Sequence, residues 1–171
     1  MSERPDQKRL LGPGFPDDDG GAPPGLVAAA TAYATDRTRY GDVLAALTTC
    51  RLLVPVVAVL GEVEVDEHGL AHDKTSDMAA VLLTGADGRL ALLAFSGTAA
   101  MAAWDPAARP VPVPARVAAQ SAVQEDAAAL LVDVAGPVRL VVEGEDLHAL
   151  AAGWTLARVG DRQAWIRPGT E

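Results

Sequence analysis

The chain has one cysteine, few aromatic residues and no long apolar run. Cys50, alone among 171 residues, cannot form an internal disulfide, which fits a reducing compartment. Aromatic residues make up 4% of the chain, so Ala, Val and Leu must fill the core. The longest strongly apolar run, residues 52–60, is interrupted by Pro55 and is far shorter than the roughly 20 residues that span a bilayer. We therefore expect a soluble cytoplasmic protein with no membrane segment.

Positive charge is also scarce. The sequence has 14 Lys and Arg against 23 Asp and Glu, which gives a formal net charge of −9. Such a chain repels the phosphates of nucleic acids, so we expect no direct nucleic-acid partner. The N-terminus mixes charges with Pro and Gly and lacks the apolar centre of a signal peptide.

The composition divides the chain into one domain and two tails. Residues 1–25 contain the run Asp17–Gly21 and a Pro pair, and they carry too little apolar surface to offset the entropy of ordering. We expect a flexible tail there, a single domain over 26–167 and a short tail over 168–171. With half of its residues hydrophobic, the chain can fill one ordinary core.

The apolar periodicity predicts an α+β fold in which short helices pack on a mixed β-sheet. The uncharged, Val-rich run 52–60 is typical of a central strand buried on both faces. Proline at every second position of 109–114 predicts an extended connector. Helices are expected over 26–34, 40–50 and 145–152, near the residues that lead to Trp104, and from Pro114 onward. Further strands are expected over 78–83, 90–95, 130–134, 138–142, 154–158 and 163–167.

Two stretches share the same order of features. Residues 82–104 and 130–154 both run strand, glycine turn, strand, Gly, short Ala-rich helix and Trp. This weak internal repeat is compatible with a duplication and with two similar ββα corners, and the sequence leaves both open. Between them and the central strand, residues 61–77 hold six acidic residues and one Lys, which predicts a solvated loop or edge ribbon.

The residues that could carry catalysis lack the partners that catalysis needs. Cys50 falls at a predicted helix end, where no helix N-terminus lowers the pKa of a thiol. His68 and His72 have metal-ligand spacing but lie in an acidic, Gly-containing stretch without a third soft ligand. Ser96 follows a strand and precedes a helix, yet the glycine two positions before a nucleophile elbow is missing, so we interpret it as a helix cap. We expect no metal and no cofactor.

One surface stretch combines an aromatic ring, an arginine and rigid extended backbone. Such a composition suits contacts with a peptide or protein. Our leading hypothesis is therefore a non-enzymatic domain that acts through protein contacts. The candidate contact residues are Trp104, Asp105, Arg109, Pro110 and Pro112.

Two other functions stay open. A small-metabolite-binding or enzymatic domain would hold an anion in a pocket, and its candidate residues are Arg51, Lys74 and Arg116. An oligomeric scaffold would instead pair sheet edges or Ala-rich helix faces between copies.

Five segments carry a family resemblance. Residues 51–56, 74–79, 92–97, 103–106 and 142–147 resemble actinobacterial members of the SseB family, in its N-terminal domain, and the likeness extends over roughly 26–152. The resemblance implies the α+β fold of that domain and attaches no catalytic role to these segments. The family name refers to enhanced serine sensitivity, which implies a cytoplasmic role in amino-acid metabolism or translation. Larger relatives have a further C-terminal domain, which we do not expect in this chain.

Overall fold

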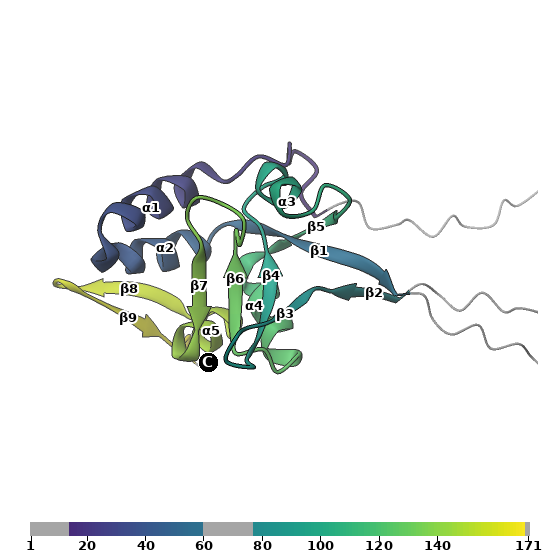
Figure 1. Ribbon diagram of the computed structural model, residues 1–171. Helices are drawn as coiled ribbons and strands as arrows, with labels where there is room; N and C mark the ends of the chain where they lie inside the picture. The colour runs from purple at the N-terminus through teal and green to yellow at the C-terminus, as the bar shows by residue number, and fades with distance from the viewer. Residues whose placement is uncertain (1–13, 60–76, 170–171) are drawn as a thin grey trace, which may run out of the picture.

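A computed structural model describes residues 14–59 and 77–169 and shows an α+β fold (Figure 1). The helices are α1 (Pro24–Thr35), α2 (Tyr40–Leu47), α3 (Thr98–Trp104), α4 (Ala115–Gln124) and α5 (Gly144–Ala151), with a 3₁₀ turn η1 (Arg37–Arg39). The strands are β1 (Arg51–Val59), β2 (Asp77–Ala80), β3 (Leu82–Thr84), β4 (Leu90–Ala94), β5 (Arg109–Pro114), β6 (Ala129–Val132), β7 (Leu140–Glu143), β8 (Thr155–Val159) and β9 (Arg162–Ile166). None of the helices within these residues is long and apolar enough to cross a membrane.

The strands form a four-stranded mixed sheet, a three-stranded antiparallel sheet and a separate hairpin. In the order β3-β4-β6-β7, β4 and β6 run parallel and the other pairs run antiparallel. The order β2-β1-β5 is antiparallel throughout. β1 meets β4 at one bridge, where Leu53 and Phe95 exchange two backbone hydrogen bonds of 2.8 Å. Figure 1 shows β4, β6 and β7 side by side, with the carboxyl ends of β4 and β6 at the same edge. β8 and β9 form a two-stranded hairpin.

The central strands are buried on both faces, because alternate residues enter two different cores. Leu92 of β4 lies in the main core with α2, α4 and α5, whereas Leu93 packs with Phe95 and Met101 in a smaller core under α3. β1 alternates in the same way. The expected fold class and the central strand are thus confirmed over the described residues.

Small residues let α4 lie close to its neighbours. Its buried stripe consists of Ala115, Ala118, Ala119 and Ala122, as the periodicity predicts. The segments of the internal repeat are both ββα units, β3-β4-α3 and β6-β7-α5, and nothing in their geometry decides whether they arose by duplication.

The proline-rich stretch is extended, as predicted, but it is a strand of a sheet and not a connector. β5 pairs with β1 in a register that places Pro112 opposite Leu53. Leu53 uses its backbone N–H and C=O on Phe95, so the pair Leu53–Pro112 is not hydrogen-bonded and the nitrogen of Pro112 faces the open edge. Pro110 and Pro114 share this orientation because the strand period is two. The prolines therefore remove backbone N–H donors only from the open edge of β5, where no strand of the described structure pairs with it.

The predicted strand over 78–83 is divided into two. β2 pairs with β1, whereas β3 pairs with β4, and Val81 between them accepts a hydrogen bond of 3.0 Å from the backbone of Leu93. The chain bends at Val81 because it changes partner there. The predicted loop over 61–77 lies outside the described residues except for Asp77.

Candidate ligand-binding pocket

A pocket of about 450 Å³ lies beyond the carboxyl ends of the parallel strands β4 and β6. Its walls come from α1, from the start of α3, from the loop between β6 and β7, and from residues 20–22. Most of the lining is apolar, with Leu26, Val27, Ala30, Ala103 and Val138 among the side chains. The space outside the carboxyl ends of neighbouring parallel strands is a frequent location of ligand sites in open sheets.

Four polar side chains line this mostly apolar pocket, those of Thr31, Ser96, Thr98 and Asp133. The hydroxyls of Thr31 and Thr98 donate to the backbone carbonyls of Val27 and Gly20. The carboxylate oxygen Oδ1 of Asp133 accepts a hydrogen bond of 2.8 Å from the backbone N–H of Ser96, which ties the end of β6 to the end of β4. Asp133 has a left-handed backbone with φ of 56°. Within the described residues, neither the second carboxylate oxygen of Asp133 nor the hydroxyl of Ser96 has a hydrogen-bond partner. These two groups are thus available to a polar group of a ligand.

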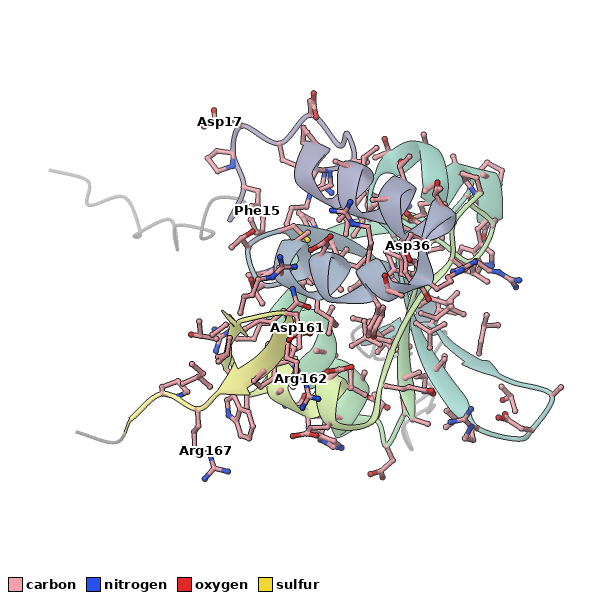
Figure 2. All side chains as sticks on the ribbon, turned by 90° about the vertical axis from the view of Figure 1, so that its left-hand side faces the viewer. Phe15, Asp17, Asp36, Asp161, Arg162 and Arg167 are labelled. Atoms are coloured by element: carbon pink, nitrogen blue, oxygen red, sulfur yellow. The ribbon has the colours of Figure 1, made fainter. Side chains whose placement is uncertain are left out.

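Residues 14–23, which we call the strap, supply one wall of the pocket. The strap runs across the end of the sheet and leads into α1; Figure 2 labels Phe15 and Asp17 within it. The carbonyl of Gly20 accepts hydrogen bonds from the backbone N–H and the hydroxyl of Thr98, at 2.8 and 3.2 Å. The strap is therefore bonded to the start of α3.

A buried arginine attaches the strap to β1. The guanidinium of Arg51 donates to both carboxylate oxygens of Asp18, at 2.5 and 2.7 Å, and to the carbonyl of Gly21 at 2.6 Å. It also donates to the carbonyl of Ser96, at the pocket. Only 7% of the Arg51 side chain and 16% of the Asp18 side chain are exposed. One residue thus links the strap, β1 and the pocket.

The charges of this pair stabilise each other. The hydrogen bonds from Arg51 hold the pKa of Asp18 below its usual value, although burial alone raises it. The bonds to Asp18 raise the pKa of Arg51 in turn. Both groups are charged at neutral pH, so each compensates the buried charge of the other.

Gly97 allows the strap to approach the end of β4. A Cβ at this position would lie 2.8 Å from the backbone nitrogen of Ala22 and 3.0 Å from the carbonyl oxygen of Gly20. Its backbone is extended, with φ of −159°, so the requirement is for space and not for a special conformation. Gly97 also occupies the N-cap position of α3 without a side-chain cap, so the prediction that Ser96 caps this helix is wrong.

The predicted boundary at residue 25 differs from the structure. Residues 18–22 are bonded to Arg51 and Thr98, and α1 begins at Pro24, so this part of the expected tail belongs to the domain. Composition does not reveal this because one ion pair and a few hydrogen bonds, not buried apolar side chains, hold the segment. The available signal was Arg51 itself, since a charged residue at the start of a buried strand requires a partner.

Of the three residues of the predicted anion pocket, Arg51 and Arg116 line different hollows. Arg51 is bound by Asp18 and lines a hollow under the strap. Arg116, near the N-terminus of α4, lines a different hollow with Trp154 and Gly153. Lys74 lies outside the described residues, as do His68 and His72.

The predicted protein-contact residues follow one another from the end of α3 into β5. The ring of Trp104 is half-buried and stacks on Phe95 in the smaller core, with ring centroids 5.5 Å apart. Asp105 accepts a hydrogen bond of 2.8 Å from the backbone of Ala107 and so ends α3. Arg109 and Pro110 are exposed, and Pro112 is half-buried. The exposed part of this stretch is thus β5, while Trp104 mainly fills a core.

Neither Cys50 nor Ser96 has an activating neighbour in the described structure. Burial raises the pKa of the Cys50 thiol to about 11, which disfavours the thiolate that acts as a nucleophile. The residues described around the Ser96 hydroxyl include no imidazole, and Asp133 bonds the backbone of Ser96 instead. No group of three His, Cys, Asp or Glu within residues 14–59 and 77–169 is arranged to hold a metal.

Comparison with known proteins gives one match. The family model for the SseB protein N-terminal domain matches residues 26–149, from the first turn of α1 to α5. No curated protein and no solved structure matches the chain. The strap precedes the matched residues, and the β8–β9 hairpin follows them.

Proposed function

We propose that this chain, which belongs to the SseB protein N-terminal domain family, is a non-enzymatic domain that binds a small molecule in the pocket behind the strap. The observation that carries the proposal is an apolar pocket of about 450 Å³ with two unpaired polar groups, Ser96 and Asp133, on its wall. Enclosed apolar pockets with a few convergent polar groups are the usual form of small-molecule sites. This assignment favours the small-molecule alternative over protein contacts, and its single cysteine supports a cytoplasmic location.

The lining defines the chemistry of the ligand. Apolar side chains of α1, α3 and the β6–β7 loop favour an apolar body. The free oxygen of Asp133 accepts hydrogen bonds and carries negative charge, so a donor such as an amine is favoured and a carboxylate is repelled. The ligand class is thus a small apolar amine.

Three probes with similar aromatic bodies and different polar heads test this class by isothermal titration calorimetry. The probes are 2-phenylethylamine, 2-phenylethanol and phenylacetate. We expect the amine to bind most tightly at this pocket, because only its ammonium gains a charge-assisted hydrogen bond to Asp133. Asp133→Asn should remove the preference for the amine over the alcohol, and Asn tolerates the left-handed backbone of this position.

A matched pair of variants locates the binding. Ala102 and Ala103 are neighbours on α3 and both are exposed, but only Ala103 lines the pocket. Ala103→Leu should fill part of the pocket and weaken amine binding at least about tenfold, or about 1.4 kcal/mol, whereas Ala102→Leu should leave it unchanged. Equal amine affinities of the two variants, or no binding of the amine to wild type, would refute the proposal.

Protein contact through β5 is a second candidate function, which the exposed edge favours. Val111 is 37% exposed beside Arg109 and Pro110, on a strand whose prolines hold it rigid. A partner would bind through side chains, because the edge offers no N–H group at its prolines. Affinity purification from the native cell with wild type and Arg109→Ala tests this, since Arg109 is exposed and its loss leaves both cores intact. Identical sets of captured proteins would argue against this surface.

An oligomeric scaffold has less support at this edge. Pairing of β5 with a second copy would lack donors at Pro110, Pro112 and Pro114. If light scattering showed a stable dimer, the two copies would have to pair through a surface other than the β5 edge.

A further inference from the structure

A second hollow, of about 400 Å³, lies on the other side of the β6–β7 loop from the strap pocket. The end of α1, the turn η1 and the outer face of β6 and β7 surround it. The two hollows share only Pro137 and Val138 among their lining residues. The second hollow is therefore a separate candidate site.

Two arginines without acidic partners line this hollow. Within the described residues, Arg37 and Arg139 form no ion pair, and neither do Arg109, Arg116, Arg162 and Arg167. What distinguishes Arg37 and Arg139 is that they line one hollow together. The carboxylate nearest in sequence to Arg37 is Asp36, and it accepts hydrogen bonds from the backbone and the hydroxyl of Thr38, at 3.0 and 2.7 Å. Two uncompensated positive charges at one hollow are notable in a chain with a net charge of −9.

The hollow also has an oriented cation and an apolar floor. The guanidinium of Arg37 lies over the ring of Tyr33, 4.5 Å from its centroid. Stacking orients the guanidinium and leaves the N–H groups at its edge free to bind an anion. Leu131 and Val141, a cross-strand pair of β6 and β7, form the floor, and Val141 is 43% exposed.

We propose that Arg37 and Arg139 bind an oxyanion, carboxylate or phosphate, whose attached apolar group lies on Leu131 and Val141. Guanidinium groups bind carboxylates and phosphates alike through paired hydrogen bonds, so the two arginines do not determine which of these oxyanions binds. We expect such a ligand to bind more tightly than a bare inorganic ion, because its apolar group is buried against Leu131 and Val141 and the ion has no apolar surface to bury. The site is independent of the proposed amine pocket.

Titrations followed by ¹H–¹⁵N correlation spectra test the site. The probes are phenylacetate, phenyl phosphate, inorganic phosphate and the neutral benzyl alcohol, each added to the full chain. We expect saturable shifts at Tyr33, Leu131 and Val141 with at least one aromatic anion, weaker binding of inorganic phosphate, and no binding of benzyl alcohol at these residues. Saturation by phenylacetate alone or by phenyl phosphate alone identifies the oxyanion. Binding should weaken as salt concentration rises.

A double variant with a matched control identifies the arginines. Arg37→Gln with Arg139→Gln should weaken binding of the aromatic anion at least about tenfold, since each arginine provides charge-assisted hydrogen bonds. Arg162→Gln with Arg167→Gln removes the same charge from exposed arginines elsewhere and should leave the affinity within about twofold at 0.15 M salt. Equal losses in both double variants, or no saturable binding to wild type, would overturn the proposal. Neither result bears on binding of 2-phenylethylamine behind the strap.

Discussion

Asp18→Asn tests the attachment of the strap with almost no change in side-chain size. The variant keeps an acceptor oxygen but removes the charge that Arg51 faces across contacts of 2.5 and 2.7 Å. The Arg51 guanidinium, 7% exposed as a side chain, retains the carbonyls of Gly21 and Ser96 as partners. Removing one partner of a fully buried pair costs about 3–5 kcal/mol. With Asp18 partly exposed and these carbonyls retained, we expect a loss of about 2 kcal/mol.

Urea denaturation measures this loss, and a neighbouring substitution controls for net charge. Asp17 is exposed and forms no side-chain hydrogen bond with the described residues, so Asp17→Asn should leave the unfolding midpoint unchanged. A loss of about 2 kcal/mol corresponds to a fall in Tm of roughly 4–8 °C for a chain of this length. If the two variants unfolded at the same midpoint, the strap would not be held by Arg51 and Asp18.

The same pair predicts a dependence on pH. The pKa of Asp18 is lower in the folded chain than its usual value of 3.8 in the unfolded chain. The ion pair therefore contributes its full stability above that value, and the contribution is lost as the pH falls through the lowered pKa. The difference in stability between wild type and Asp18→Asn should be constant from neutral pH to about pH 5 and should shrink below about pH 4. A difference that grew in acid would contradict this assignment.

The remaining predictions concern three other positions. Gly97→Ala should destabilise the chain by about 1–3 kcal/mol in urea denaturation, because a Cβ would lie 2.8 Å from strap backbone; Gly25→Ala, with nothing within 4 Å, is its control, and equal midpoints would show that no close approach exists. Cys50 should react with a disulfide reagent at pH 7.5 far more slowly in the folded chain than in urea, since its pKa is raised to about 11; equal rates would contradict its burial. Trp104→Ala should cost about 3 kcal/mol because it removes the ring stacked on Phe95, and an unchanged midpoint would place Trp104 outside the core.

Local patterns predicted most of the secondary structure because burial and periodicity act over a few residues. The uncharged run predicts β1, and the alanine stripe predicts the buried face of α4, because each pattern lies within the residues of one element. β5 was missed as a strand for a related reason. Proline at every second position excludes a central strand, but the sequence does not say that the missing donors face an open edge.

The candidate pocket could not be predicted from spacing, since distant segments form it. Ser96 and Asp133 are 37 positions apart and meet only because β4 and β6 are parallel neighbours. The strap reaches the same place through Asp18, whose partner Arg51 is 33 positions away. Such contacts depend on strand order, which the sequence pattern left undetermined. Arg37 and Arg139 likewise come together only through the fold.

Binding of 2-phenylethylamine behind the strap tests the central claim most directly, by chemical-shift mapping on the assigned full chain. The proposal predicts saturable shifts at Ala30, Ser96 and Val138, which line the pocket from three different segments. These shifts should be lost in Ala103→Leu and kept in Ala102→Leu. Shifts that do not saturate, or that saturate only at residues outside this lining, would contradict the assignment of the pocket as the binding site.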